Sequence, residues 1–272
     1  MTGSVIRAKR TLISRKKRES QGDRAIPAEV PVALTYDSAT YAVMMASPAN
    51  LEDFALGFSL SERIIETPAE IAGLGVVEMP NGFELRMSLV RPRAVELDSR
   101  RRRIAGPAGC GLCGIESLEA AIRPPRRVDA ALSVPRATIF TAVRSLEKYQ
   151  AVNAETHAVH AAGFWSMETN TYEAVREDVG RHNALDKLIG ELARAGIDAG
   201  KGFIVMTSRV SIELVQKTAV VGSPMLVAVS APTSFALAAA EAANITLVAV
   251  ARNDSFEVFS HPERITADAN VA

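Results

Sequence analysis

The chain has 272 residues and a mass of 29.1 kDa, with 48% hydrophobic and 23% charged residues, as in an ordinary globular protein with a large core. Lys and Arg together number 31, and so do Asp and Glu, so net charge favours neither nucleic acid nor an anionic membrane as a partner. No apolar run is long enough to span a bilayer. Two cysteines provide no disulfide framework and are typical of a reducing cytoplasm, where we expect the protein to act.

The N-terminal segment is strongly basic. Its first eighteen residues contain seven Lys and Arg and no Asp or Glu. The polar residues 19–23 follow, where a signal peptide would need an apolar stretch. We expect residues 1–29 to form a basic, flexible, solvated tail, with a docking arm as the alternative.

Residues 30–105 are expected to form a small α+β lobe. Two short strands are predicted within 31–45, and helical spacing of apolar residues predicts a helix over 51–65, capped by Ser47 or Asn50. The run Pro80-Asn81-Gly82 between two alternating segments predicts a β-hairpin.

Both cysteines lie in one glycine-flanked motif, in which Cys110 and Cys113 are separated by two residues. Glycines let a partner approach the sulfur atoms, and a C-x-x-C arrangement lowers the pKa of one thiol. Arginines at 91–103 precede the motif, and they either stabilise a thiolate or persulfide or form a solvated face. We expect residues 106–134 to be a reactive Cys-x-x-Cys loop and linker; the alternative is a surface loop with two idle cysteines.

Residues 135–272 are expected to form an α/β domain. The first predicted elements are a helix at 135–149, a strand at 156–165, a turn at 168–170 and a helix at 184–195. Three apolar runs then alternate with helical segments, which predicts parallel strands joined by right-handed crossovers: 203–207, 225–230 and 245–251, with helices at 210–221 and 233–243.

Polar residues follow each of these three strands, at the edge where ligands bind in such sheets. Hydroxyl groups and free backbone N–H groups at helix N-termini form a seat for phosphate, although they also serve as ordinary helix caps. The candidate residues at the strand ends are Thr207, Ser208, Arg209, Ser230, Thr233, Val250, Ala251, Arg252, Asn253, Asp254 and Ser255.

A polar motif, Arg176-Glu177-Asp178-Val179-Gly180-Arg181-His182-Asn183-Ala184-Leu185-Asp186-Lys187, lies between these regions. Together with the cysteine motif, Thr207–Val210, Gln216-Lys217 and Ser230–Thr233, it resembles the FdhD family of formate dehydrogenase accessory sulfurtransferases. The resemblance covers about residues 30–265. It departs from the family pattern at Arg63, where glycine is common, and at Asp254 and Ser255, where a glycine and a basic residue are common.

The resemblance implies a sulfur carrier. Such proteins accept persulfide sulfur from a cysteine desulfurase and pass it to the molybdenum (or tungsten) bis-pyranopterin guanine dinucleotide cofactor, which formate dehydrogenase needs for activity. It also implies a homodimer and a cytidine-deaminase-like three-layer core, with a mixed, largely parallel sheet in the C-terminal part and a smaller N-terminal lobe.

Residue roles carried over from the family place the sulfur on Cys110, with Cys113 as its neighbour, and the guanine dinucleotide at 250–255, in agreement with the strand-end argument. His182 is expected to be an acid/base or ligand contact, or else a polar residue that caps the helix at 184–195. Glu177, Asp178, Arg181 and Asn183 are expected to organise the turn before that helix.

Four other functions remain as alternatives. Zinc normally takes four ligands, and the chain has only two cysteines, so a zinc site would need His160 or His182 to complete the set. We therefore expect no permanently bound metal. A deaminase would need H-x-E before P-C-x-x-C, and here His261-Pro262-Glu263 follows the cysteines. A thioredoxin-type oxidoreductase would place the cysteines within a βαβ unit. A non-catalytic chaperone would bind the cofactor and the dehydrogenase without moving sulfur.

Overall fold

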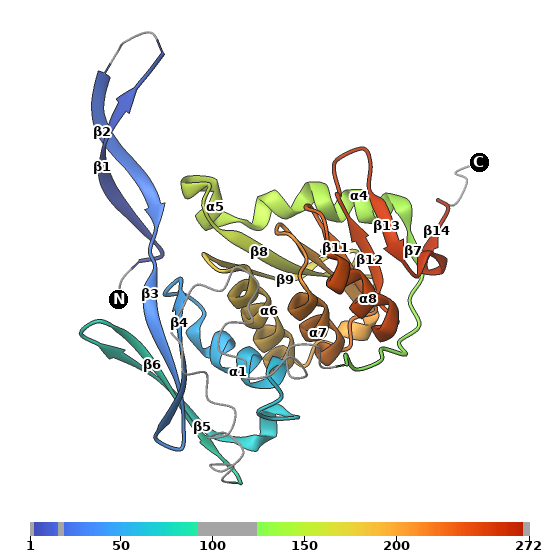
Figure 1. The fold of residues 1–272 in the computed structure, drawn as a ribbon, viewed down its shortest axis with the longest axis horizontal. Coiled ribbons are helices and arrows are strands. Elements are labelled where there is room, and N and C mark those ends of the chain that lie inside the picture. Colours follow the sequence, from blue (N-terminus) through green and yellow to red (C-terminus); the bar gives the residue numbers. More distant parts are fainter. Residues whose placement is uncertain (1–2, 16–18, 92–123, 269–272) are drawn as a thin grey trace.

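The computed structural model describes residues 3–15, 19–91 and 124–268. The cysteine motif and most of the arginine-rich segment lie outside these residues. The described chain forms an N-terminal hairpin arm, a small lobe with a four-stranded sheet, and a larger domain with a six-stranded sheet (Figure 1). Among the described helices, none combines the length and the apolar character that crossing a membrane requires.

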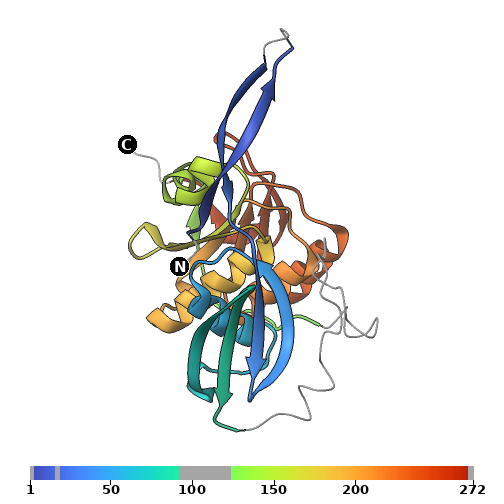
Figure 2. The ribbon, with the colours of Figure 1, turned by 90° about the vertical axis from the view of Figure 1, so that its left-hand side faces the viewer.

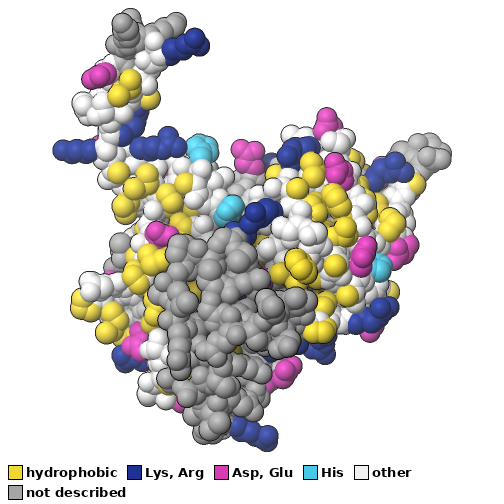
Figure 3. All heavy atoms as spheres, in the orientation of Figure 1, with side chains coloured by type: hydrophobic (Ala, Val, Ile, Leu, Met, Phe, Trp, Pro, Cys, Tyr) yellow, Lys and Arg dark blue, Asp and Glu magenta, His cyan; other side chains and the backbone are white. Residues whose placement is uncertain are grey.

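The basic N-terminal segment forms an antiparallel hairpin of β1 (Val5–Ile13) and β2 (Glu19–Pro27), where a flexible tail was expected. Residues that favour β-strands, such as Ile6 and Thr11, are interspersed with cations in β1. This pattern is compatible with a two-stranded ribbon that is exposed to solvent on both faces. The base of the hairpin contacts α5 (Ala151–Thr156), and Ala25 is buried there. Figure 2 shows the rest of the hairpin projecting away from the body, and Figure 3 shows Lys and Arg side chains standing out from it.

The small lobe packs one helix against one face of a sheet. Its sheet has the order β4-β3-β6-β5, and its core holds large side chains such as Tyr36, Phe54 and Phe58. The predicted strands and hairpin are confirmed. The elements are β3 (Val30–Tyr36), β4 (Ala39–Ala46), α1 (Leu51–Ser61), a 3-10 turn (Pro68–Glu70), β5 (Ile71–Met79) and β6 (Gly82–Leu89).

Helix α1 is shorter than the apolar spacing predicts, because it ends at Ser61 and the chain then turns. Arg63 has φ 55°, in the left-handed region that glycine adopts without steric cost. This conformation explains why a glycine suits the position. Asn50 precedes the helix in the expected place, but its side chain makes no capping hydrogen bond.

The larger domain keeps the predicted order of elements, with different bounds for some of them and with additional strands, β7, β9, β13 and β14. Residues 151–156 form a short helix, so the strand expected from 156 begins only at His160. The helix expected at 184–195 begins at Arg181, and a final antiparallel strand follows β12. The elements are β7 (Val134–Pro135), α4 (Arg136–Ser145), α5, β8 (His160–Ser166), β9 (Thr171–Asp178), α6 (Arg181–Ala195), β10 (Gly202–Met206), α7 (Ile212–Val221), β11 (Met225–Ala228), α8 (Ser234–Ala243), β12 (Thr246–Ala249), β13 (Glu257–Ser260) and β14 (Ile265–Thr266), with 3-10 turns at Leu146–Tyr149, Ala199–Lys201 and Pro262–Arg264.

The sheet of this domain has the order β13-β12-β11-β10-β8-β9. Strands β10, β11 and β12 are parallel, as predicted from their apolar runs. The sheet is mixed, but the expectation that it is largely parallel is wrong: β8 is antiparallel to both β9 and β10, and β13 is antiparallel to β12. The short turn after β8 folds β9 back beside β8, and the chain after β12 returns as β13 beside β12.

Helices cover both faces of the sheet, so the domain has three layers. One face packs against α6, α7 and α8 through residues such as Ile204, Leu226 and Leu247. The other face packs against α4 through residues such as Phe203, Val227 and Val248. Strands β10 to β12 are buried on both faces, which explains their apolar sequences.

The two lobes meet where α1 lies against α6. Gly57 on α1 and Gly190 on α6 allow this close approach, because a methyl group at Gly57 would overlap the carbonyl oxygen of Asp186, and one at Gly190 would overlap that of Asp53. Burial of Phe54 and Leu56 in the lobe and of Leu188 and Ile189 in the domain completes the junction. The lobes therefore share a tightly packed interface.

We predict that Gly57→Ala destabilises the protein by about 3 kcal/mol, because backbone on the facing helix must move to accommodate the methyl group. Urea unfolding followed by circular dichroism measures this loss. Gly75→Ala is the control, since a methyl group at that position meets nothing within 4 Å. Equal stability of the Gly57→Ala variant and the wild type would contradict the close contact of α1 and α6.

Candidate functional site

One edge of the six-stranded sheet gathers the polar residues of the predicted site. Because β8 is antiparallel to both β9 and β10, strand β9 runs parallel to β10, β11 and β12. The carboxyl ends of these four strands therefore lie at the same edge, which we call the strand-end edge. The first residue of β8, His160, lies there too, since it pairs with Asp178 at the end of β9. Ligands of open α/β sheets bind at such an edge.

The residues after β10 contribute mainly to the structure of this edge. Thr207 Oγ1 accepts a hydrogen bond from the backbone N–H of Ala161 at 2.9 Å. The Ser208 hydroxyl is buried and donates to the carbonyl oxygen of Arg209 at 3.1 Å. Arg209 is exposed. The structure thus places these predicted residues at the edge, but it uses both hydroxyl groups within the protein.

The loops after β11 and β12 are joined to each other and to the loop after β10. Thr233 caps α8, since its hydroxyl accepts from the N–H of Ala236 at 3.3 Å, so here the capping interpretation holds. The backbone N–H of Thr233 donates to the carbonyl oxygen of Val210, and that of Val250 donates to Ser230. The three loops form one continuous surface.

The segment 250–255 turns sharply at this surface. Val250 has φ 51°, which strains a β-branched residue, and such strain is concentrated at functional sites. The Arg252 guanidinium donates to the carbonyl oxygens of Val229 and Ala251, and its backbone N–H donates to Ser255. Ala251 is buried, whereas residues 252–255 are exposed. The guanidinium therefore links the turn at 250–255 to Val229, at the start of the loop after β11.

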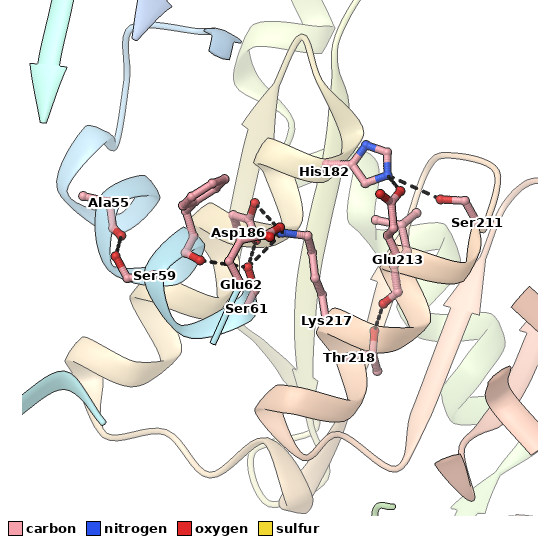
Figure 4. A network of polar contacts seen from close by, with 12 residues as sticks. Ala55, Ser59, Ser61, Glu62, His182, Asp186, Ser211, Glu213, Lys217 and Thr218 are labelled. Atoms are coloured by element: carbon pink, nitrogen blue, oxygen red, sulfur yellow. Dashed lines mark hydrogen bonds and ion pairs between the residues drawn. The ribbon is translucent and has the colours of Figure 1, made fainter. Parts of the chain in front are cut away.

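His182 stands beside this surface, in the first turn of α6. Its Nε2 lies 3.0 Å from Oε2 of Glu213 and 3.3 Å from Oγ of Ser211, both at the start of α7 (Figure 4). The helix cap is Gly180, so His182 is not the capping residue. Sequence reasoning missed Ser211 and Glu213, because nothing in the motif around His182 indicates a partner about thirty residues later.

The motif at 176–187 is chiefly a clamp between the lobes. Lys187 and Asp178 are both fully buried, with Nζ 2.6 Å from Oδ2, and Nζ also donates to the carbonyl oxygen of Ser47 at 2.9 Å. The carboxylate of Asp178 accepts from the backbone N–H groups of Ser47 and Gly180 and from the Asn183 amide. Asp178 and Asn183 thus organise the turn as expected, and they also bind the end of the small lobe.

A second buried ion pair joins α6, α7 and the end of α1. Lys217 Nζ lies 2.7 Å from Oδ1 of Asp186, donates to Ser61 at 2.8 Å and reaches Glu62 at 3.3 Å (Figure 4). Burial raises the pKa of Asp186, and the charge of Lys217 opposes that rise. As expected for neighbours on a helix, Asp186 and Lys187 bind different partners.

A third cluster completes the clamp on the outer side of α6. Arg176 lies 2.8 Å from Asp53 and 2.5 Å from Glu191, and Arg194 approaches the same two carboxylates. Asp53 is a buried residue of α1, so these cations hold the start of that helix against α6. Glu177 instead accepts from the backbone N–H groups of Val152 and Asn153 at the start of α5.

Cys110 and Cys113, the predicted sulfur site, lie outside the described residues. The distances given above therefore do not include them. Among the described residues, no three His, Cys, Asp or Glu side chains are grouped so as to hold a metal ion.

Comparisons with known proteins agree on one family. The family model described as FdhD/NarQ matches residues 27–266. The chain belongs to the FdhD/NarQ family. A protein from Agrobacterium fabrum named "Sulfur carrier protein FdhD" is 50% identical over 96% of each chain. One of the same name from Xanthomonas campestris pv. campestris is 46% identical over 97% of this chain and 92% of its own.

A solved structure shares the fold of this family member. The crystal structure of a putative formate dehydrogenase accessory protein from Desulfotalea psychrophila superposes with a TM-score of 0.74 at 24% identity, covering 96% of this chain and 99% of that one. The family match begins at residue 27, so β1 and nearly all of β2 precede the matched region.

We predict that Lys187→Met destabilises the protein by about 3–5 kcal/mol, because it leaves the Asp178 carboxylate buried without its cation. Denaturant unfolding measures the loss. Lys201→Met is the matched control, because Lys201 is exposed and lies 3.9 Å from the exposed Glu168. Similar losses in the two variants would show that the buried pair has no special role.

We predict that His160 makes the protein less stable in mild acid. Burial is the main cause that lowers the pKa of His160 below its ordinary value near 6.5, and the charge of Arg181 adds to it. The unfolded chain then binds the proton first, so stability falls as the pH drops from about 7.5 to about 5.5. Unfolding at both pH values should show a smaller fall in His160→Asn. His157→Asn, at an exposed position, should behave as wild type; an unchanged fall in His160→Asn would refute the assignment.

Proposed function

We propose that this protein is a sulfur carrier that supports formate dehydrogenase activity. It accepts persulfide sulfur from a cysteine desulfurase on Cys110, with Cys113 as neighbour, and transfers it to the molybdenum bis-pyranopterin guanine dinucleotide cofactor. Family membership over residues 27–266 is the observation that carries this proposal, together with relatives named sulfur carrier proteins at 45–50% identity. The single C-x-x-C motif supplies the thiol chemistry.

The first chemical step follows from thiol–disulfide exchange. The thiolate of Cys110 attacks the outer sulfur of the desulfurase persulfide, forming a new S–S bond. The original S–S bond breaks, and the desulfurase cysteine leaves as a thiolate, so atoms and electrons balance. We expect the flanking glycines to let a partner approach the sulfur, and a persulfide on a thiolate is a reversible modification. Cys113 tunes the first thiol or assists release of the sulfur.

The strand-end edge is the proposed seat for the guanine dinucleotide part of the cofactor, which is the substrate here. Three joined loops, the N-terminal ends of α7 and α8 and the strained turn at Val250 support this assignment. Backbone N–H groups at helix N-termini favour phosphate. Five of the predicted contacts are at least partly exposed at this edge: Arg209, Ser230, Asn253, Asp254 and Ser255. Ser208 and Ala251 are buried, so they would affect a ligand only through the conformation of the backbone.

The compartment, the oligomeric state and the division into domains are also proposed. We propose a cytoplasmic homodimer with a cytidine-deaminase-like core, and a division into a small lobe, a cysteine loop and an α/β domain. The three layers around the mixed sheet and the separate core of the small lobe support that division.

We predict that Cys110→Ala abolishes formate dehydrogenase maturation and that Cys113→Ala weakens or abolishes it. The decisive assay is intact-protein and peptide mass spectrometry after incubation with an active cysteine desulfurase and cysteine. We expect a reductant-labile gain of one sulfur atom on Cys110. An unmodified mass, or full maturation with both cysteines replaced, would contradict sulfur transfer and favour a non-catalytic chaperone.

We predict that GDP raises the melting temperature, because a ligand that binds only the folded state stabilises it by mass action. Differential scanning fluorimetry with increasing GDP measures the shift, and ADP at equal concentrations is the control. The absence of a shift at saturating GDP would argue against a guanine nucleotide seat at the strand-end edge.

A further inference from the structure

The contact between His182 and α7 joins the polar motif to the proposed nucleotide seat. His182 lies in the first turn of α6, while Ser211 and Glu213 belong to the start of α7, so two helix N-termini converge on one imidazole. The side chain of His182 is 13% exposed and that of Glu213 is 8% exposed. Ser211 is buried and does not cap its own helix, although it occupies the capping position. Its hydroxyl instead faces the imidazole (Figure 4).

The two oxygens fix which ring nitrogen carries a proton. A carboxylate only accepts hydrogen bonds, so a lone pair on Nε2 at 3.0 Å from Oε2 of Glu213 would be repelled. The structure gives Nε2 a hydrogen bond with Ser211, whereas Oε2 of Glu213 is buried without a hydrogen bond. A buried acceptor in this state is costly unless a proton lies close by. The proton therefore stays on Nε2, between the two oxygens.

A neutral imidazole with its proton on Nε2 has its lone pair on Nδ1. Figure 4 shows the second ring nitrogen on the side of the ring away from Glu213 and Ser211. It has no hydrogen-bond partner among the residues that the structure describes. In its neutral form the side chain thus presents a fixed acceptor at the strand-end edge, beside the loop that follows β10.

We infer that Glu213 and Ser211 are positioning residues that hold His182 as the Nε2–H tautomer, and that Nδ1 accepts a hydrogen bond from the bound nucleotide. A lone pair repels phosphate oxygens, so the matching group is a donor, either a ribose hydroxyl or an N–H of guanine. This inference rests on the proposed function for the identity of the ligand, but not for the state of the imidazole.

The first test reads the tautomer directly and needs no nucleotide. The chain has four histidines, so long-range proton–nitrogen correlation spectra at about pH 8 can be assigned by single substitutions. We expect His182 to be in the Nε2–H form in wild type and to become a mixture in Glu213→Gln, because an amide can donate or accept. His157→Asn is used to identify one of the other signals. A wild-type Nδ1–H form, or a spectrum unchanged by Glu213→Gln, would overturn the positioning role.

The second test measures GDP binding by calorimetry. In His182→Gln the amide N–H replaces the Nε2–H donor, whereas the amide oxygen is bonded to Cδ and does not reproduce the position of Nδ1, so the contact with α7 is kept and the acceptor at that position is lost. We expect GDP to bind about 5–10-fold more weakly to this variant, as for loss of one neutral hydrogen bond, and more weakly to Glu213→Gln by a smaller factor. Unchanged affinity in His182→Gln would overturn the ligand contact.

Two analogues distinguish the donors. 2′,3′-Dideoxy-GDP lacks the ribose hydroxyls, and IDP lacks the exocyclic amine of guanine. The analogue that lacks the relevant donor should bind wild type and His182→Gln equally, whereas the other should still discriminate between them. If both analogues discriminate as GDP does, the donor is the ring N–H that they share. Failure of the sulfur-transfer assay would leave the tautomer result standing, so the two proposals fail independently.

Discussion

The buried ion pair between Asp178 and Lys187 is the interaction on which the arrangement of the two lobes depends. The chain reverses at Gly180 between these residues, so the pair holds the end of β9 against α6, and both side chains also bind the backbone of Ser47. Desolvation lowers the pKa of Lys187, and the carboxylate of Asp178 counteracts this effect. Removing one partner from such a pair leaves an unpaired buried charge and is strongly destabilising. We infer that the pair fixes one arrangement of β9, α6 and the small lobe. The close contact of α1 and α6 at Gly57 restricts this arrangement further.

The same turn that carries the clamp also delivers His182 to the strand-end edge. Lys187 lies five positions after His182, so α6 presents one side to the small lobe and its first turn to the loop after β10. The motif at 176–187 therefore has a structural role at its buried residues, and we propose a functional role at His182. In a sulfur carrier, this connection would keep the cofactor seat rigid while the cysteine segment supplies the sulfur.

Sequence reasoning predicted the parts of the fold that depend on local patterns. The apolar runs of β10, β11 and β12 indicate strands that are buried on both faces of a sheet. The loops that follow these strands were correctly predicted to lie at one edge of that sheet. The hairpin at the N-terminus was missed, because cations in β1 suppress the apolar alternation that usually indicates a strand. The ion pairs of Lys187 and Lys217 were missed for another reason: their partners are brought close by the turn from β9 into α6 and by the packing of α7 against α6, and no spacing in the sequence encodes these contacts.

We conclude that the polar clamp makes the small lobe and the α/β domain one cooperative unit. Native-state hydrogen exchange of the wild-type protein in low concentrations of denaturant can show this, because it reports the opening free energy of each helix separately. We expect the amides of α1 and α6 to exchange through the same opening, with the same free energy. Exchange of α1 and its sheet at a clearly lower free energy, with α6 still protected, would contradict it.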